Sequence, residues 1–427
     1  MNEFSSPELL QVETCAIQRF LKYVTIETTA NANASTSPSS DGQRILGNLL
    51  VEELKSIGLP DTSLDSNGYV TATLPGAEGH TVGLIAHMDT SDAFSGRNVQ
   101  PMVHHNYSGE PIVLKNDVTL SLQTDPALSR CIGHTLITTD GTTLLGADDK
   151  AGIAIIMGVL EYLHRHPEVP HPTIRVCFTP DEEIGRGTDH FPIDEFKADF
   201  AITVDGTFAG ELNFETFEAY SIDVAFTGVS VHPGHAKGTM VNALRYLGEF
   251  LHRLPVDKSP ETTEQREGFI HPVTVSGDAA SCRAHLIIRD FTESGVEALC
   301  QMVESIVADI RQLEPRLKVK TVTQFNYPNM IKYVAPHEDL VTNLKTAVKK
   351  AGISPSPVPI RGGTDGANLC RKGLVTPNLF TGAVNLHGPR EWVSVTNMGY
   401  SFCAIMNLLG MYVSRHADSA SHRSSDE

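Results

Sequence analysis

The chain lacks the basic surface that nucleic-acid binding requires. Its 427 residues include 33 Lys and Arg against 51 Asp and Glu, a formal net charge of −18. A protein that binds a duplex must neutralise phosphates with Lys and Arg side chains, and no cluster of these residues occurs in the sequence. Nucleic acid is therefore not an expected partner, and the acidity is best explained by solubility.

The sequence also lacks signs of a disulfide framework, a secretory signal or a membrane span. The seven cysteines are scattered, odd in number and without a Cys-x-x-Cys pair, which predicts buried thiols in a reducing compartment and no thiolate zinc site. Residues 1–5 have no basic segment followed by an apolar one, and no apolar stretch reaches membrane-spanning length. We therefore expect a cytoplasmic protein without a membrane partner.

The first half of the chain alternates strand and helix signals. Buried strands are predicted at 82–86, 173–178 and 201–204, and a helix at 152–164. Short apolar strands that alternate with helices are typical of an α/β sheet covered by helices on both faces. The polar segment 29–41 is predicted to be a loop between two helices, and 414–427 is expected to fray.

The middle of the chain follows a different order. We predict strands at 219–226, 284–290 and 317–322, one further strand before 284, and helices at 241–254 and 294–313. This β-α-β-β-α-β order is typical of a small ferredoxin-like α+β domain. We place that domain at 217–328, inserted into a larger domain formed by 1–216 and 329–427.

Two polar motifs offer side chains of the kinds that bind divalent metals. His87 and Asp89 follow the strand at 82–86, and a carboxylate behind an imidazole is the usual support of a zinc-bound histidine. Asp148 and Asp149 precede an apolar helix. Helix capping explains one of these acids, whereas a carboxylate that bridges two divalent metals would explain the second.

Three more acidic or imidazole positions complete the pattern. Glu182 and Glu183 lie in a run of three acids after the strand at 173–178, Asp205 follows the next strand, and His387 lies far downstream. Neighbouring carboxylates repel one another unless cations are near, and one Glu could bind metal while the other acts as a general base. Nitrogen and oxygen ligands without thiolate favour a hydrolytic zinc pair over a structural zinc site.

This ordered set resembles the two-zinc clan of aminoacylases, dipeptidases and carboxypeptidase-like enzymes, and within it the tripeptide aminopeptidases. The resemblance runs from about residue 25 to 413. It is most specific at 85–90, 136–141, 146–152, 232–234, 236–238, 240–243 and 361–366. It implies a mixed-sheet zinc-exopeptidase catalytic domain with an inserted lid or dimerisation domain.

The resemblance also implies roles for the residues of the site. His87 and Asp205 would hold one zinc ion, Glu183 and His387 the other, and Asp148 would bridge the pair. Glu182 would be the general base, Asp89 would orient His87, and the peptide bond after Asp148 would be cis.

Three residues are implied to contact the substrate. His232 would stabilise the oxyanion, and Asn242 and Arg361 would anchor the peptide. A simple turn at His232-Pro233-Gly234 and a surface arginine are the structural alternatives. Phe208 departs from the glycine-rich pattern of the family and could narrow the pocket.

The implied activity is removal of the first residue from tripeptides with two zinc ions per subunit. A dipeptidase, carboxypeptidase or N-acyl amino-acid deacylase on the same scaffold remains an alternative, as does a non-catalytic metal-dependent binding protein. The sequence leaves open the preferred first residue, the metal used in the cell and the role of His235. It also leaves open whether the chain is a monomer or a homodimer through the inserted domain, and in which subunit His232 acts.

Overall fold

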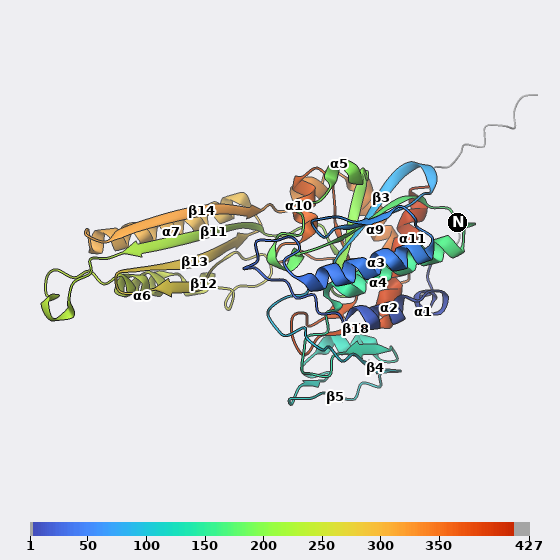
Figure 1. Ribbon diagram of the computed structural model, residues 1–427, viewed down its shortest axis with the longest axis horizontal. Coiled ribbons are helices and arrows are strands. Elements are labelled where there is room, and N and C mark those ends of the chain that lie inside the picture. Colours follow the sequence, from blue (N-terminus) through green and yellow to red (C-terminus); the bar gives the residue numbers. More distant parts are fainter. Residues whose placement is uncertain (1–2, 414–427) are drawn as a thin grey trace, which may run out of the picture. The chain divides into compact units, whose positions relative to one another are not determined.

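The computed structural model describes residues 3–413, which form two compact units (Figure 1). Residues 3–213, 334–357 and 372–413 make up unit 1, and residues 214–333 and 358–371 make up unit 2. The segment 358–371, which the sequence left in the larger domain, belongs to unit 2. The segment 414–427, predicted to fray, lies outside the described residues. None of the helices in the described chain has the length and hydrophobicity needed to cross a bilayer.

Unit 1 is built on an eight-stranded sheet of order β1-β2-β8-β3-β9-β16-β10-β15. Its strands are β1 (Thr62–Leu64), β2 (Val70–Leu74), β3 (Ala77–His87), β8 (Pro172–Thr179), β9 (Phe200–Gly206), β10 (Glu211–Asn213), β15 (Ser356–Pro357) and β16 (Asn378–Phe380). The central strands β8, β3, β9 and β16 are parallel, whereas β1, β2 and β10 add antiparallel pairs. The predicted α/β class with a mixed sheet is confirmed.

Helices of unit 1 pack around this sheet. They are α1 (Leu9–Glu13), α2 (Ala16–Tyr23), α3 (Asp41–Ile57), α4 (Ala147–Arg165), α5 (Ile193–Phe196), α9 (Glu338–Lys350) and α11 (Val395–Met411). Helix α4 is buried along most of its length and contacts β3, β9, α2 and α11. Gly152 permits this packing, because a Cβ there would lie 2.0 Å from the Val204 carbonyl oxygen of β9. The close approach brings the first turn of α4 to the end of β9.

A second, smaller sheet of unit 1 was not predicted. Its order is β17-β18-β7-β4, formed by β4 (Met102–His104), β7 (Leu136–Thr138), β17 (Ala383–Val384) and β18 (Trp392–Ser394). A hairpin of β5 (Ile112–Val113) and β6 (Thr119–Leu120) lies near it in the chain. Leu120, Leu136 and Trp392 form part of its separate apolar core. Strands of two or three residues are too short to show an alternating pattern.

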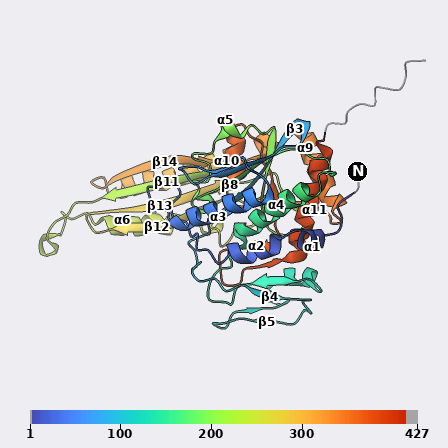
Figure 2. The same ribbon diagram turned by 45° about the vertical axis from the view of Figure 1, so that its right-hand side comes forward.

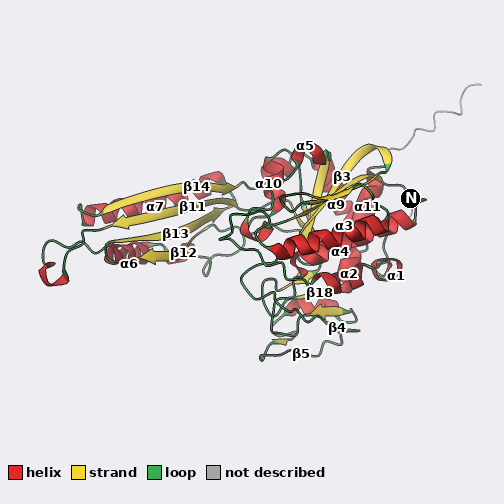
Figure 3. Cartoon of the chain, in the orientation of Figure 1, coloured by secondary structure: helices red, strands yellow, loops and turns green. Residues whose placement is uncertain are grey.

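Unit 2 has the ferredoxin-like order that the sequence predicts. It comprises β11 (Glu218–Thr227), α6 (Ala243–Arg253), β12 (Phe269–Gly277), β13 (Ser281–Asp290), α7 (Glu293–Leu313) and β14 (Lys318–Tyr327), followed by α10 (Asp365–Arg371). The antiparallel sheet has the order β12-β13-β11-β14 (Figures 2 and 3). Alternate residues of β11, among them Ile222, Val224 and Phe226, share one core with apolar residues of α6 and α7. The strand expected before 284 is β12.

Candidate active site

Three neighbouring parallel strands of unit 1 end at the same edge of the sheet. Strand β3 ends at His87, β8 at Thr179 and β9 at Gly206. The carboxyl ends of parallel strands are where α/β sheets place their ligand sites. His87, Asp205 near the end of β9 and the acidic residues that follow β8 are therefore brought together by the topology.

Asp148 lies between two imidazoles. Its Oδ1 is 3.0 Å from Nε2 of His87, and its Oδ2 is 3.0 Å from Nε2 of His387. His387 Nε2 is also 2.9 Å from Oε1 of Glu183, and His87 Nε2 is 3.7 Å from Oδ1 of Asp205. All five predicted metal ligands thus converge, with Asp148 in the position that a bridging carboxylate would take.

The donor set of this cluster fits two divalent cations. His87, Asp148 and Glu183 offer ligand atoms within 4.8 Å of one another, and so do His87, Asp149 and Asp205. Every donor in these groups is an imidazole nitrogen or a carboxylate oxygen, a combination suited to catalytic zinc and related ions.

The electrostatics of the cluster are those of a cation site. Burial and the neighbouring Asp149 carboxylate raise the pKa of Asp205 well above its ordinary value. Hydrogen bonds to Asp148 and Glu183 raise the pKa of His387 to about 11. Buried carboxylates that crowd together favour either protonation or cation binding, and bound divalent ions would stabilise their ionised form.

Asp89 supports two parts of the site at once. Its Oδ1 lies 3.3 Å from Nδ1 of His87, consistent with the predicted orienting role. Its two carboxylate oxygens also accept hydrogen bonds from the backbone N–H groups of Glu182 and Glu183, at 3.0 and 3.1 Å. Because Asp89 is fully buried, these bonds fix the turn that carries both glutamates.

Glu391 is a buried carboxylate that the sequence analysis missed. It is 1% exposed and accepts hydrogen bonds from the backbone N–H groups of Leu145, Gly146 and Asp148, at 2.7, 2.9 and 3.1 Å. Burial raises its pKa to about 7. Glu391 therefore holds the loop that presents Asp148, in which the Asp148–Asp149 peptide bond is cis. The sequence does not indicate this role, because Glu391 is an isolated acidic residue before a strand of only three residues.

Two other acidic residues of these motifs accept hydrogen bonds from backbone N–H groups. Asp149 accepts hydrogen bonds from the N–H groups of His87 and Gly152, both at 3.2 Å. Asp181 accepts hydrogen bonds from Ser39 N–H and from Nε2 of Gln43, both at 2.8 Å. The predicted loop at 29–41 is thereby tied to the residue that precedes Glu182.

The three predicted substrate contacts all lie in unit 2. His232 is exposed and its Nδ1 accepts a hydrogen bond from Gly234 N–H within its own turn. Asn242 is the N-cap of α6, with Oδ1 accepting from Leu244 N–H at 3.0 Å.

Arg361 makes several contacts within the same unit. Its Nη1 donates to the carbonyls of Gln265 and Glu267, at 2.9 and 2.8 Å, and its guanidinium lies 5.2 Å from the ring centre of Phe217. A grip on a peptide carboxylate would compete with these bonds.

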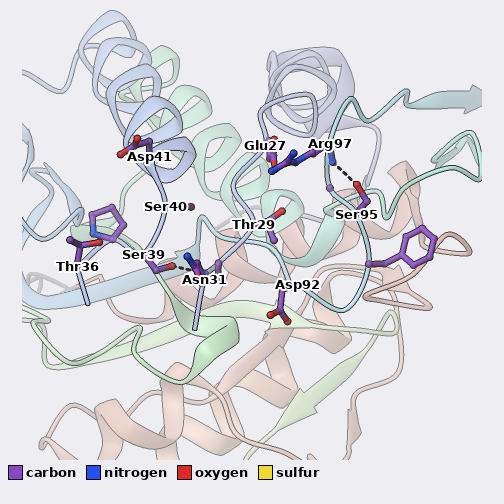
Figure 4. Close-up of a pocket in the computed structure, with 14 residues that line it drawn as sticks. Glu27, Thr29, Asn31, Thr36, Ser39, Ser40, Asp41, Asp92, Ser95 and Arg97 are labelled. Carbon is purple, nitrogen blue, oxygen red and sulfur yellow. Dashed lines mark hydrogen bonds and ion pairs between the residues drawn. The ribbon is translucent and has the colours of Figure 1, made fainter. Parts of the chain in front are cut away.

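Two cavities of unit 1 lie near segments of the site. Phe208, expected to narrow the pocket, lines a cavity of about 290 Å³ together with Trp392 and Tyr400. A larger cavity of about 550 Å³ is lined mostly by polar residues of 27–41 and 92–97 (Figure 4).

The family follows from comparison with known proteins. Residues 138–409 match Peptidase family M20/M25/M40. Peptidase T of Shouchella clausii (strain KSM-K16) is 46% identical over 402 residues, which cover 93% of this chain and 98% of that protein. The chain belongs to peptidase family M20/M25/M40, in its peptidase T group. It is thus a peptide hydrolase by family.

Solved structures share the fold of this peptidase. The crystal structure of aminopeptidase PepT from Bacillus cereus ATCC 10987 superposes with a TM-score of 0.72 at 18% identity, over 93% of this chain and 98% of that one. A dinuclear metal-binding M20 peptidase from Bacillus subtilis superposes with a TM-score of 0.60 at 12% identity, over 93% and 97% of the two chains. At such identities the likeness shows the fold alone. That fold agrees with a chain whose unit 2 is inserted into the sequence of unit 1.

Proposed function

We propose that this peptidase is a zinc-dependent aminopeptidase that removes the first residue from tripeptides. The observation that carries the proposal is the position of Asp148 between the imidazoles of His87 and His387, with Glu182 on a turn fixed by Asp89. The peptidase T relatives and the PepT structure support the choice of an aminopeptidase. The alternatives on the same scaffold are a dipeptidase, a carboxypeptidase and an N-acyl amino-acid deacylase.

The metal ligands follow from the cluster. His87 and Asp205 would hold one zinc ion, Glu183 and His387 the other, and Asp148 would contact both. When bound, the two ions supply Lewis acidity, which lowers the pKa of water and stabilises negative charge on the peptide oxygen.

Side chains of the protein carry out the proton transfers and hold the site residues in position. Glu182 takes a proton from the attacking water and returns it to the departing amine, as a general base and then a general acid. Asp89 keeps His87 in one tautomer through Nδ1 and keeps Glu182 in place through its backbone N–H. Glu391 fixes the loop of Asp148.

Unit 2 would contribute the substrate contacts. His232 stabilises the oxyanion, and its exposed ring is available for that contact. Asn242 would use its amide N–H groups, since its Oδ1 caps α6. Arg361 would bind the peptide carboxylate only by exchanging bonds that it makes to backbone carbonyls. A homodimer through the inserted domain and a cytoplasmic location remain predictions.

Product analysis by mass spectrometry tests the proposal. Zinc-loaded protein is given one free tripeptide and, separately, the same peptide with an acetylated amine. Loss of the first residue from the free peptide alone is expected. Deacetylation, or loss of the last residue from either peptide, would favour one of the alternatives, and no change in either would favour a metal-dependent binding protein.

A further inference from the structure

The smaller cavity of unit 1 has the composition of a small-molecule pocket. Its volume is about 290 Å³, at the lower end of the range of about 300–1,000 Å³ that such pockets occupy. The aromatic rings of Phe208, Trp392 and Tyr400 line it, together with aliphatic side chains such as Val384 and Ile353. Mostly apolar walls with a few polar groups are typical of sites that bind small ligands.

Asn397 is a buried polar residue of this wall with an unused acceptor. It is 8% exposed, and its Nδ2 donates to Sγ of Cys131 at 3.8 Å. Its Oδ1 accepts no hydrogen bond among the described residues, and it is not enclosed, in contrast to the unpartnered Oγ of Ser401. Because Asn397 lines the cavity, a ligand there can reach this oxygen. Buried polar atoms are normally satisfied, so the cavity favours an occupant that brings an N–H donor.

The other polar residues of the wall are joined to this amide. Nδ1 of His134 is 2.9 Å from Oγ of Ser394, and the same Oγ accepts a hydrogen bond from the N–H of Asn397 at 3.2 Å. Arg130 precedes Cys131, the residue whose sulfur contacts Asn397. The guanidinium of Arg130 is exposed and makes no ion pair or hydrogen bond among the described residues, and no acidic residue is found among those that line the cavity. A ligand there would meet a positive charge and an amide acceptor in the same cavity.

We propose that this cavity binds a free amino acid with a large apolar side chain. Arg130 binds its carboxylate, and Oδ1 of Asn397 accepts a hydrogen bond from its α-ammonium group. The apolar side chain packs against the rings of Phe208, Trp392 and Tyr400. The small volume suits a ligand of one residue. The inference goes beyond the proposed function, since it concerns a second ligand, and for a peptide hydrolase that ligand is a product of its own reaction.

Trp392 gives a direct signal of binding, because it is the chain's sole tryptophan and lines the cavity. Its emission, excited where phenylalanine does not absorb, is followed while phenylalanine is added to the zinc-loaded protein, and we expect a saturable change. 3-Phenylpropionate lacks the amine and phenethylamine lacks the carboxylate, so each should bind about tenfold more weakly. Glycine could reach the metal cluster through the same amine and carboxylate, but it should leave this emission unchanged.

Two variants assign the contacts. Arg130→Gln should weaken the binding of phenylalanine by about tenfold and leave that of phenethylamine unchanged. Arg245→Gln, at an exposed arginine of α6 in unit 2, is the matched control and should bind as the wild type does. Asn397→Leu removes the acceptor of the ammonium group, so it should bind phenylalanine and 3-phenylpropionate with nearly equal affinity.

Four results would each overturn the inference. They are no saturable change with phenylalanine, an equal change with glycine, wild-type affinity for phenylalanine in Arg130→Gln, and a preference for phenylalanine over 3-phenylpropionate that survives in Asn397→Leu. None of these measurements depends on turnover. Failure to cleave a tripeptide would therefore overturn the aminopeptidase function and leave this binding site standing.

Discussion

At the scale of single residues, the proposed metal ligands are arranged by carboxylates that lie outside the predicted ligand set. Asp89, Asp149 and Glu391 each accept backbone hydrogen bonds within the segments that carry ligands. Such outer carboxylates set the orientation and basicity of ligands. The sequence could predict Asp89, because it stands two residues after His87. Glu391 could not be predicted, because its partners lie more than 240 residues away in the chain.

Glu182 provides the sharpest test of the mechanism. Glu182→Gln keeps the size of the side chain but removes the base, so kcat should fall by about 10²–10⁴-fold. Metal content, measured by atomic emission on purified protein, should remain that of the wild type. Glu78→Gln, at an exposed position of β3, is the matched control. Full activity of Glu182→Gln would refute the assignment.

Glu391→Gln separates support of the metal site from direct catalysis. The neutral amide presents one acceptor where the carboxylate has two, so the N–H groups of Leu145, Gly146 and Asp148 cannot all be satisfied. Metal affinity should fall by about 10–100-fold, and saturating zinc should restore most of kcat. Titration against a zinc indicator, together with kcat at each zinc concentration, measures both effects. Unchanged affinity would show that the loop keeps its conformation without the carboxylate.

At the scale of elements, prediction succeeded where burial made strands visible in the sequence. The central strands β3, β8 and β9 are apolar runs that end at the site, and their parallel order brings His87, Glu183 and Asp205 together. The small sheet of β17, β18, β7 and β4 was missed although it flanks the loop of His387. Its position depends on pairing between residues far apart in sequence, such as Trp392 with Thr138.

Asp125 joins this small sheet to the His387 loop. Its Oδ2 accepts hydrogen bonds from Nε1 of Trp392 at 2.6 Å and from Nδ2 of Asn385 at 2.7 Å. Asp125→Ala leaves both donors without this acceptor and should lower the free energy of unfolding by about 3 kcal/mol.

The chain's sole tryptophan reports on this change. The emission of Trp392 should shift to longer wavelength in Asp125→Ala and remain unshifted in Asp189→Ala, an exposed control in unit 1. Chemical denaturation followed at the same wavelength gives the stability change. An unshifted spectrum with wild-type stability in Asp125→Ala would show that the loop does not depend on this carboxylate.

At the scale of the molecule, the chain forms two units that the sequence could only partly delimit. The ferredoxin-like order of unit 2 was predictable, because its strands and helices are long and strongly patterned. The membership of 358–371 in unit 2 was not, because contacts such as that of Arg361 with Glu267 join segments about 90 residues apart. The five proposed metal ligands, in contrast, all lie in unit 1.

This division predicts that metal binding stabilises one unit selectively. Zinc at a hundredfold excess over its dissociation constant should stabilise unit 1 by about 2.7 kcal/mol. Hydrogen exchange followed by mass spectrometry should show added protection at 86–90, 145–152 and 179–186, the segments that carry or support ligands. Strands β11 and β13 of unit 2 should exchange at the same rate with and without metal, and removal of zinc by a chelator should reverse the gain. His387→Ala, which lacks one ligand, should gain less protection, whereas equal gains in both units would show that metal binding orders the two units together.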